Sequence, residues 1–132
     1  MKIRLIPLPF AGVNNRRSLI YLGNLVDAII TICISSEAAG QTYLVSDGVD
    51  VSTAELIRRI ARALGRPARL FSFPTSIMQL AGKVLGKSAT LDRLFGSLTV
   101  DISKIRHELK WKTPYRMEDG LKETAEWFKE QF

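Results

Sequence analysis

The sequence predicts a small α/β (α+β) domain that is mostly helical and has a few short strands. Short extended segments alternate with helical segments along the chain, which is the pattern of this class. The length of 132 residues suits one domain, and a hydrophobic content of 46% is enough to build a core. We therefore expect residues 1–132 to form a single domain without an internal boundary.

The first part of the chain contains two extended segments and one unusually apolar helix. Ile3–Phe10 and Arg17–Leu22 are short and apolar, as edge strands or extended stretches are. Asn24 is expected to cap a helix that runs to about Ser36. Cys33 within it is expected to be a buried apolar side chain. Because this helix has almost no polar face, it needs cover on several sides, which predicts a partner surface from outside this small domain.

The middle of the chain contains a predicted strand, a turn and the clearest helix. Gln41–Val45 alternates as a strand does, and Asp47–Gly48 forms the turn after it. Ser52 and Glu55 have the spacing of a capping box, in which each side chain bonds the other residue's backbone N–H. The helix that they start is expected to end at Gly65 in a left-handed conformation. Its solvated face is expected to carry three arginines: Arg58, Arg59 and Arg62.

The second half of the chain is predicted to be mostly helical. The expected elements are a strand at Leu70–Phe73, a helix from Pro74 to Gly86, a helical turn at Thr90–Phe95, an extended piece from Leu98 to Val100, and a helix from Asp101 to Leu109. The last helix is expected from Glu118, because acidic residues favour the first turn of a helix. Its buried face is predicted to consist of Leu121, Ala125, Phe128 and Phe132.

Composition restricts the classes of function. The net charge of +6 and the pI of 9.8 predict an anionic partner, such as a phosphate ligand, a nucleic acid or a membrane surface, although such a charge also serves plain solubility. One cysteine and one histidine are too few for a His/Cys metal site. No apolar run reaches the ~20 residues that span a bilayer, and the first residues lack a signal-peptide pattern. We therefore expect a cytoplasmic protein.

The chain lacks the motifs of a self-sufficient active site. A Rossmann-type NAD site needs a glycine-rich turn, and no G-x-G-x-x-G or close relative occurs. The dehydrogenase pair Tyr-x-x-x-Lys is absent too, because none of the three tyrosines is followed by lysine at that spacing. A nucleophile elbow and a P-loop are likewise absent.

Asn14–Ser18 is the most prominent polar cluster. Its adjacent Arg16 and Arg17 could present guanidinium forks to a diphosphate. Local composition alone favours a solvated loop instead. Arg93, flanked by apolar residues, is a second candidate that by itself reads as a surface arginine.

Three stretches of the sequence are similar to signatures of a known family. Arg17–Ala28 is similar to R-x-[FYL]-[IV]-[HY]-V-x-D-L-[AV]-x-A, Asp101–Pro114 to D-x-S-K-x-x-x-x-L-G-W-x-P, and Glu118–Phe128 to [LM]-x-[ED]-G-L-x-x-T-x-x-W-[YF]. The chain thus resembles, over essentially its whole length, the C-terminal substrate-binding region of the extended short-chain dehydrogenase/reductase family. The resemblance is greatest to NAD-dependent sugar-nucleotide epimerases and dehydratases of the UDP-glucose 4-epimerase type. Gly23–Asn24 and Lys110 depart from the common form of these signatures.

The resemblance implies a substrate site. Arg17 matches the arginine that contacts the nucleotide diphosphate, and Phe10 matches the segment that lines the uracil. Arg93 matches a second phosphate-binding arginine, although its spacing differs. Asn15 and Arg16 belong to the same implied substrate-binding segment. The implied ligand is a UDP-sugar or a diphosphate-linked sugar, and this segment resembles that of a subgroup that acts in bacterial polysaccharide biosynthesis.

The resemblance also implies what must come from elsewhere. In the family, the NAD-binding turn and the Tyr-x-x-x-Lys pair lie upstream of the aligned region, so this chain is expected to hold no cofactor by itself and to be catalytically incomplete. The missing Rossmann domain would then be its partner, and the uncovered apolar helix is expected to favour self-association. This interpretation involves no nucleic acid and no membrane span. The alternative is a non-enzymatic basic module that binds nucleic acid or another protein.

Overall fold

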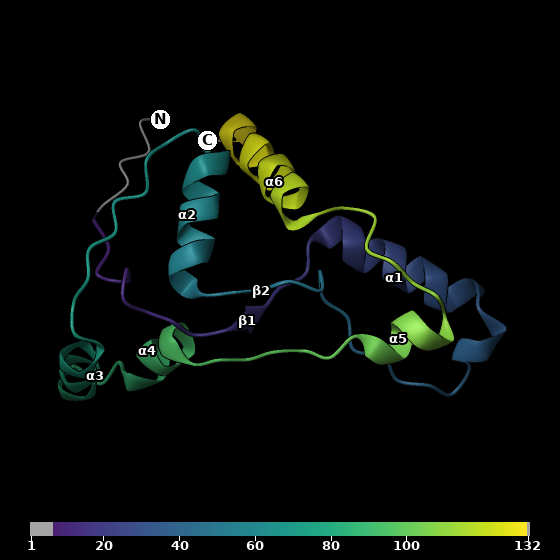
Figure 1. Cartoon of the computed structure of the whole chain (residues 1–132), viewed down its shortest axis with the longest axis horizontal. Coiled ribbons are helices and arrows are strands. Elements are labelled where there is room, and N and C mark those ends of the chain that lie inside the picture. Colours follow the sequence, from purple (N-terminus) through teal and green to yellow (C-terminus); the bar gives the residue numbers. More distant parts are fainter. Residues whose placement is uncertain (1–6, 132) are drawn as a thin grey trace.

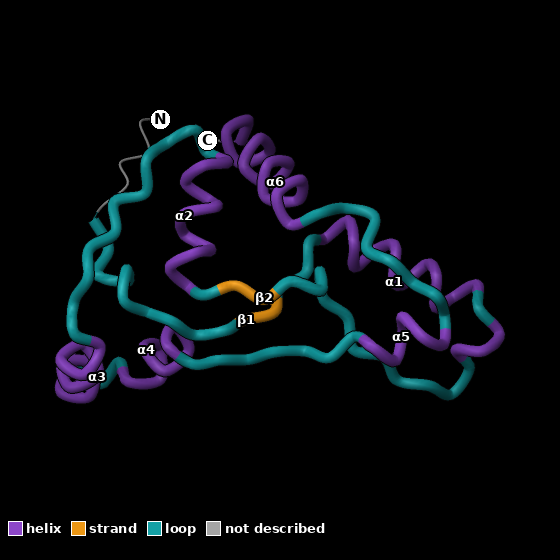
Figure 2. The backbone as a smooth tube through the Cα atoms, viewed as in Figure 1, coloured by secondary structure: helices purple, strands orange, loops and turns teal. Residues whose placement is uncertain are grey.

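The computed structural model describes residues 7–131 and confirms a small, mostly helical α+β fold (Figure 1). The elements in chain order are β1 (Arg17–Ser18), α1 (Leu22–Ile34), a 3-10 turn η1 (Ser36–Ala38), β2 (Asp50–Val51), α2 (Thr53–Ala63), α3 (Thr75–Val84), α4 (Ser88–Phe95), α5 (Ser103–Glu108) and α6 (Met117–Gln131). The helices lie around the periphery and are joined by long extended connections (Figure 2).

The sheet is short and lies near the middle of the molecule. β1 and β2 pair antiparallel, with Arg17 opposite Val51 and Ser18 opposite Asp50. Two isolated parallel bridges are formed as well, one from Arg17 to Leu98 and one from Leu8 to Leu70. Three segments far apart in the sequence therefore meet at β1.

A hydrophobic core cluster packs α1 against α5. Its buried members are Ala28, Ile102, Ile105 and Trp111. The Trp111 indole N–H also donates to Asp27 Oδ2 at 2.9 Å, so the largest side chain of this core has its polar atom satisfied. The remaining contacts include α2 against α6, side by side at the top of the view, and α3 against α4 at the end opposite α1 and α5 (Figure 1).

The predicted cap of α1 is wrong, because the helix starts three residues earlier than a cap at Asn24 implies, at Leu22 with Tyr21 as the N-cap. Asn24 lies inside the helix and is fully buried. Asp47, which lies outside α1, bonds the start of this helix instead. Its Oδ1 accepts from the Tyr21 backbone N–H at 3.0 Å and from Asn24 Nδ2 at 2.7 Å. A residue from a distant turn thus holds the N-cap residue in place, while no side chain is recorded on the first backbone N–H groups of α1 in the described chain.

Local signals at α2 are confirmed in most respects. Ser52 Oγ accepts from the Glu55 N–H at 3.1 Å, and Gly65 ends the helix region with φ 69°. Arg59, however, is not on a solvated face: its side chain is 22% exposed and bonds Glu118 Oε1 at 2.7 Å. Glu55 pairs with Arg59 at 2.9 Å, and this hydrogen bond holds the pKa of the Glu55 carboxyl below its usual value. The glutamate of the predicted capping box is therefore engaged by an arginine.

Two predicted strands do not form. Gln41–Val45 has no strand partner among the described residues, and Leu70–Phe73 makes only the single bridge from Leu70 to Leu8. A strand needs a neighbour to bond its N–H and C=O groups, and alternation alone cannot supply one. Of the predicted segment Ile3–Phe10, residues 1–6 lie outside the described residues, as does Phe132. The helices α4 and α6 begin one or two residues before their predicted starts.

The helix α1 leaves most of its apolar surface uncovered. Only Asn24 and Ala28 are buried, whereas Ile29 is 51%, Ile30 is 55% and Ile34 is 80% exposed. The prediction that Cys33 is buried is wrong, since its side chain is exposed. Among residues 7–131, no helix combines the length and apolar character needed to cross a bilayer.

Candidate functional site

Two segments that are distant in the sequence come together along β1. The Arg16 N–H donates to Ser97 Oγ at 3.0 Å, the Leu98 N–H to Arg16 O at 2.9 Å, and the Ser18 N–H to Leu98 O at 2.9 Å. The five residues of the expected substrate site all lie on this seam or next to it: Phe10, Asn15, Arg16, Arg17 and Arg93. We refer to residues 10–18 and 93–98 together as the seam.

Arg17 is held by the main chain of the partner segment. Its Nη1 donates to Arg93 O, 76 positions further along the chain, and lies 3.5 Å from Gly96 O. Both acceptors are backbone carbonyls, so they neutralise no charge on the guanidinium. A guanidinium has five N–H donors, and those of Nη2 and Nε have no partner among the described residues.

Arg16 points to the opposite strand. Its Nη2 bonds Asp50 Oδ2 at 2.9 Å, and the arginine side chain remains 74% exposed. The other oxygen of Asp50 accepts from Ser18 Oγ at 2.5 Å. An exposed ion pair of this kind contributes little stability, typically about 0.2–1 kcal/mol.

Asn15 is a buried connector of three segments. Its Oδ1 accepts from the Thr53 N–H at 2.8 Å, and its Nδ2 lies at 3.0 Å from Thr53 Oγ1, 3.1 Å from Leu94 O and 2.9 Å from Gly96 O. The residue is only 6% exposed. All polar atoms of its side chain are therefore used inside the protein, which makes Asn15 a residue that positions the arginines next to it.

Phe10 and Arg93 complete the seam. The Phe10 ring meets Phe95 edge to face, with centroids 6.2 Å apart, and stays half-buried. The Arg93 side chain is exposed and has no hydrogen-bond or ionic partner among residues 7–131. Thr53, which is central to the hydrogen-bond network around Asn15, was not predicted from the sequence. Its position directly after the Ser52 cap indicates the first residue of a helix and does not indicate a bond to Asn15.

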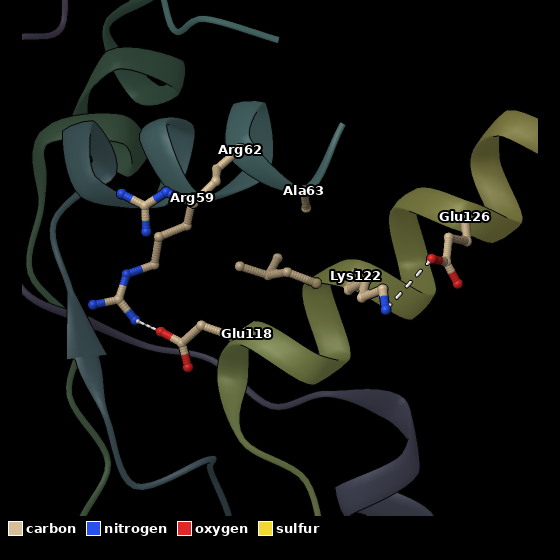
Figure 3. Close-up of a pocket in the computed structure, with 7 residues that line it drawn as sticks. Arg59, Arg62, Ala63, Glu118, Lys122 and Glu126 are labelled. Carbon is tan, nitrogen blue, oxygen red and sulfur yellow. Dashed lines mark hydrogen bonds and ion pairs between the residues drawn. The ribbon is translucent and has the colours of Figure 1, made fainter. Parts of the chain in front are cut away.

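A separate concavity lies between α2 and α6 (Figure 3). It has a volume of about 270 Å³ and is lined by Arg59, Arg62, Ala63, Glu118, Leu121, Lys122 and Glu126. One ion pair crosses it, from Arg59 of α2 to Glu118 of α6 at 2.7 Å, and a second lies along α6, where Lys122 is 3.9 Å from Glu126. This mutual pairing reduces the positive potential that α2 could offer to an external anion.

The residues present do not fit the NAD that the family uses. Neither of the glycine turns nearest to a helix start follows a strand, as a dinucleotide-binding turn does: Gly86 lies two positions before α4, between two helices, and Gly48 lies ahead of β2 and α2. The N–H groups that a pyrophosphate would need there are already bonded, that of Thr53 to Asn15 and that of Glu55 to Ser52. The described residues thus provide no cradle for this cofactor.

The family resemblance predicted from the sequence is confirmed by comparison with curated proteins, in which the chain is similar to a sugar-nucleotide epimerase. The relative is a UDP-glucose 4-epimerase from Vibrio cholerae, to which the chain is 48% identical over 124 residues. The match covers 93% of this chain but only 38% of that enzyme, which is consistent with a C-terminal region. No protein-family model matches the chain, and no solved structure matches it.

Proposed function

We propose that this chain is the nucleotide-sugar-binding part of an NAD-dependent epimerase or dehydratase, and that Arg17 and Arg93 of the seam bind the diphosphate. The observation that supports this most is the bond from Arg17 to the carbonyl of Arg93, which brings two guanidinium-bearing residues together from 76 positions apart. Hydride transfer would require the cofactor domain and the Tyr-x-x-x-Lys pair from the rest of such an enzyme.

The chemistry of the seam suits a diphosphate. Arg17 uses one nitrogen on carbonyl oxygens and keeps further N–H donors for phosphate oxygens, which guanidinium groups bind in pairs. Arg93 is exposed without a protein partner in the described chain and can turn toward the same anion. Arg16 would also bind the diphosphate if the phosphate oxygens replaced Asp50 as its partner. The exposed ion pair between Arg16 and Asp50 costs little to break.

The half-buried Phe10 supplies an apolar ring next to these cations, and we assign it to the uracil base. UDP-sugars and lipid-diphosphate-linked sugars share the diphosphate, so both fit the proposal. A role in polysaccharide biosynthesis follows from the sequence resemblance of the segment around Phe10 and Arg17.

Isothermal titration with UDP, UDP-glucose and uridine tests the proposal. We expect UDP and UDP-glucose to bind and uridine, which lacks the phosphates, to bind much more weakly. Arg17→Ala should weaken UDP binding by roughly 10- to 150-fold, because a hydrogen bond to a charged group contributes about 1.5–3 kcal/mol. Arg58→Ala is the matched control, since Arg58 is an exposed arginine of α2 and its loss changes the net charge equally. An equal loss of UDP affinity in Arg17→Ala and Arg58→Ala would mean that the weakening comes from the change in net charge alone, which would contradict the proposal.

A salt titration with generic duplex DNA separates this function from that of a basic nucleic-acid-binding module. Binding to phosphate backbones falls steeply with salt and should be strong at low salt for such a module. We expect negligible binding, because two of the three arginines of α2, Arg58 and Arg59, are paired with glutamates. Strong low-salt binding that Arg17→Ala leaves unchanged would favour the nucleic-acid function.

A further inference from the structure

A groove runs between the start of α1 and α6. One hollow, of about 220 Å³, is lined by Leu19, Ile20, Tyr21, Leu22, Asp47, Leu56, Met117, Gly120, Leu121 and Thr124. A second, of about 490 Å³, is lined by Tyr21, Leu22, Gly23, Glu123, Thr124 and Trp127. The two hollows share Tyr21, Leu22 and Thr124, so we treat them as one α1–α6 groove. The Tyr21 ring lies so close to Gly120 that an added Cβ there would be 2.6 Å from the ring, which fixes one wall of the groove.

The floor of the groove contains a buried carboxylate that is only half used. Asp47 is 8% exposed. Its Oδ1 accepts from the Tyr21 N–H and from Asn24 Nδ2, whereas Oδ2 has no donor among residues 7–131. Within the same residues no lysine or arginine forms an ion pair with Asp47; the nearest guanidinium described near this turn is that of Arg106, which packs over Gly48. Because no side-chain oxygen or nitrogen of the described residues is both fully enclosed and unbonded, Oδ2 is accessible, and a positively charged donor in the groove could form a charge-assisted hydrogen bond with it.

The lining is negatively charged in a positively charged protein. The chain has a net charge of +6, yet the groove residues include no lysine or arginine and two acids, Asp47 and Glu123.

Aromatic rings add a second feature that suits a cation. Tyr21 and Tyr115 stack edge to face with centroids 5.4 Å apart, and Trp127 at the mouth is 57% exposed. Ring faces attract ammonium groups, and the same rings together with Leu22 would cover an apolar body.

We propose that the α1–α6 groove binds a small organic ammonium ion, a primary amine on an apolar or aromatic body, with the ammonium on Asp47 Oδ2 and the body against Tyr21 and Trp127. This site is distinct from the seam and does not depend on the function proposed for it. The amine is recognised by charge at the floor and by apolar contact at the mouth.

Benzylammonium is a suitable probe, followed by ¹H–¹⁵N chemical-shift titration of the whole chain and by Trp127 fluorescence. We expect saturable shifts at Tyr21, Gly120 and Thr124. Benzyl alcohol, which has the same ring without the charge, should bind at least tenfold more weakly. Ammonium chloride, which has the charge without the ring, should leave these signals unshifted.

Asp47→Asn removes the charge and keeps a carbonyl oxygen for the two bonds that Oδ1 accepts, so it should weaken benzylammonium binding at least tenfold. Asp92→Asn, an equal charge change at an exposed position of α4, is the control and should bind as the parent does. Trp127→Leu tests the mouth without touching Asp47, and should weaken binding severalfold even if Asp47→Asn fails to fold. Equal affinity for benzyl alcohol, unchanged binding by folded Asp47→Asn, or no saturable shift in the folded parent would each overturn the proposal.

Discussion

The most informative perturbation is Asn15→Ala, because one buried amide holds the start of α2, the end of α4 and the arginine segment together. Truncation removes four hydrogen bonds, each with a net contribution of about 1 kcal/mol. Two of the acceptors keep other donors: Leu94 O still accepts from Thr53 Oγ1 at 2.8 Å, and Gly96 O still faces Arg17. The Thr53 N–H, however, is left buried without an acceptor.

Balancing these terms, we expect Asn15→Ala to lower the free energy of unfolding by about 3 kcal/mol. That is a large share of the roughly 5–15 kcal/mol that is typical of a domain. Urea unfolding followed by far-ultraviolet circular dichroism measures the change, provided that the transition is two-state. Asn14→Ala is the matched control, because Asn14 is the exposed neighbour of the same residue type.

Two results would decide whether this reasoning holds. A loss for Asn15→Ala no greater than that for Asn14→Ala would refute the connector role. If the role is right, Asn15→Ala should also weaken UDP binding, since the arginines at 16 and 17 lose their anchor, whereas Asn14→Ala should leave the affinity unchanged.

Two further predictions concern other parts of the molecule. The Tyr43 hydroxyl donates to Glu108 at 2.7 Å, and this hydrogen bond raises the pKa of the phenol to about 12. The folded state therefore favours the protonated phenol. The stability that this bond contributes is fully present below the ordinary pKa of 10.0 and is lost as pH rises through about 12. A titration followed by phenolate absorbance should therefore contain a step near pH 12. Tyr43→Phe should remove this step, and Glu108→Gln should move it toward pH 10. A step that Glu108→Gln leaves in place would contradict the assignment to the Tyr43–Glu108 bond. On α1, Ile30→Lys should reduce self-association in sedimentation velocity because it places a charge in the uncovered apolar face. Ser36→Lys adds the same charge beside that face, and an equal effect from it would trace the change to net charge alone.

Short-range chemistry explains which elements could be predicted from sequence. The Ser52 cap and the left-handed Gly65 depend on residues a few positions apart, and both are confirmed. The start of α1 could not be placed from its own residues because its N-cap, Tyr21, has no capping side chain and is held by Asp47, 26 positions away. Gln41–Val45 alternates like a strand but finds no ladder partner in the described chain, and pairing is a property of the whole fold.

The same distinction applies to the candidate site. Local composition could not distinguish a solvated loop from a binding segment at Arg16 and Arg17, and only the family resemblance linked them to Arg93. The structure brings Arg17 and Arg93 together through a bond across 76 positions. It also assigns Asn15 to the interior, where its amide is satisfied by partners that no local pattern reveals. Asp47 has the sequence context of a turn residue, and its bonds to Tyr21 and Asn24, 26 and 23 positions away, could not be read from that context.

The way in which Arg17 is anchored leaves position 93 free to vary. Its acceptors are the carbonyl oxygens of residues 93 and 96, which every amino acid possesses. Replacing the side chain at 93 would therefore leave the guanidinium of Arg17 where it is, while changing what stands beside it. If the seam binds the proposed diphosphate, selectivity among ligands could be adjusted at this one position without disturbing the anchor of Arg17, which makes position 93 a natural first choice for engineering.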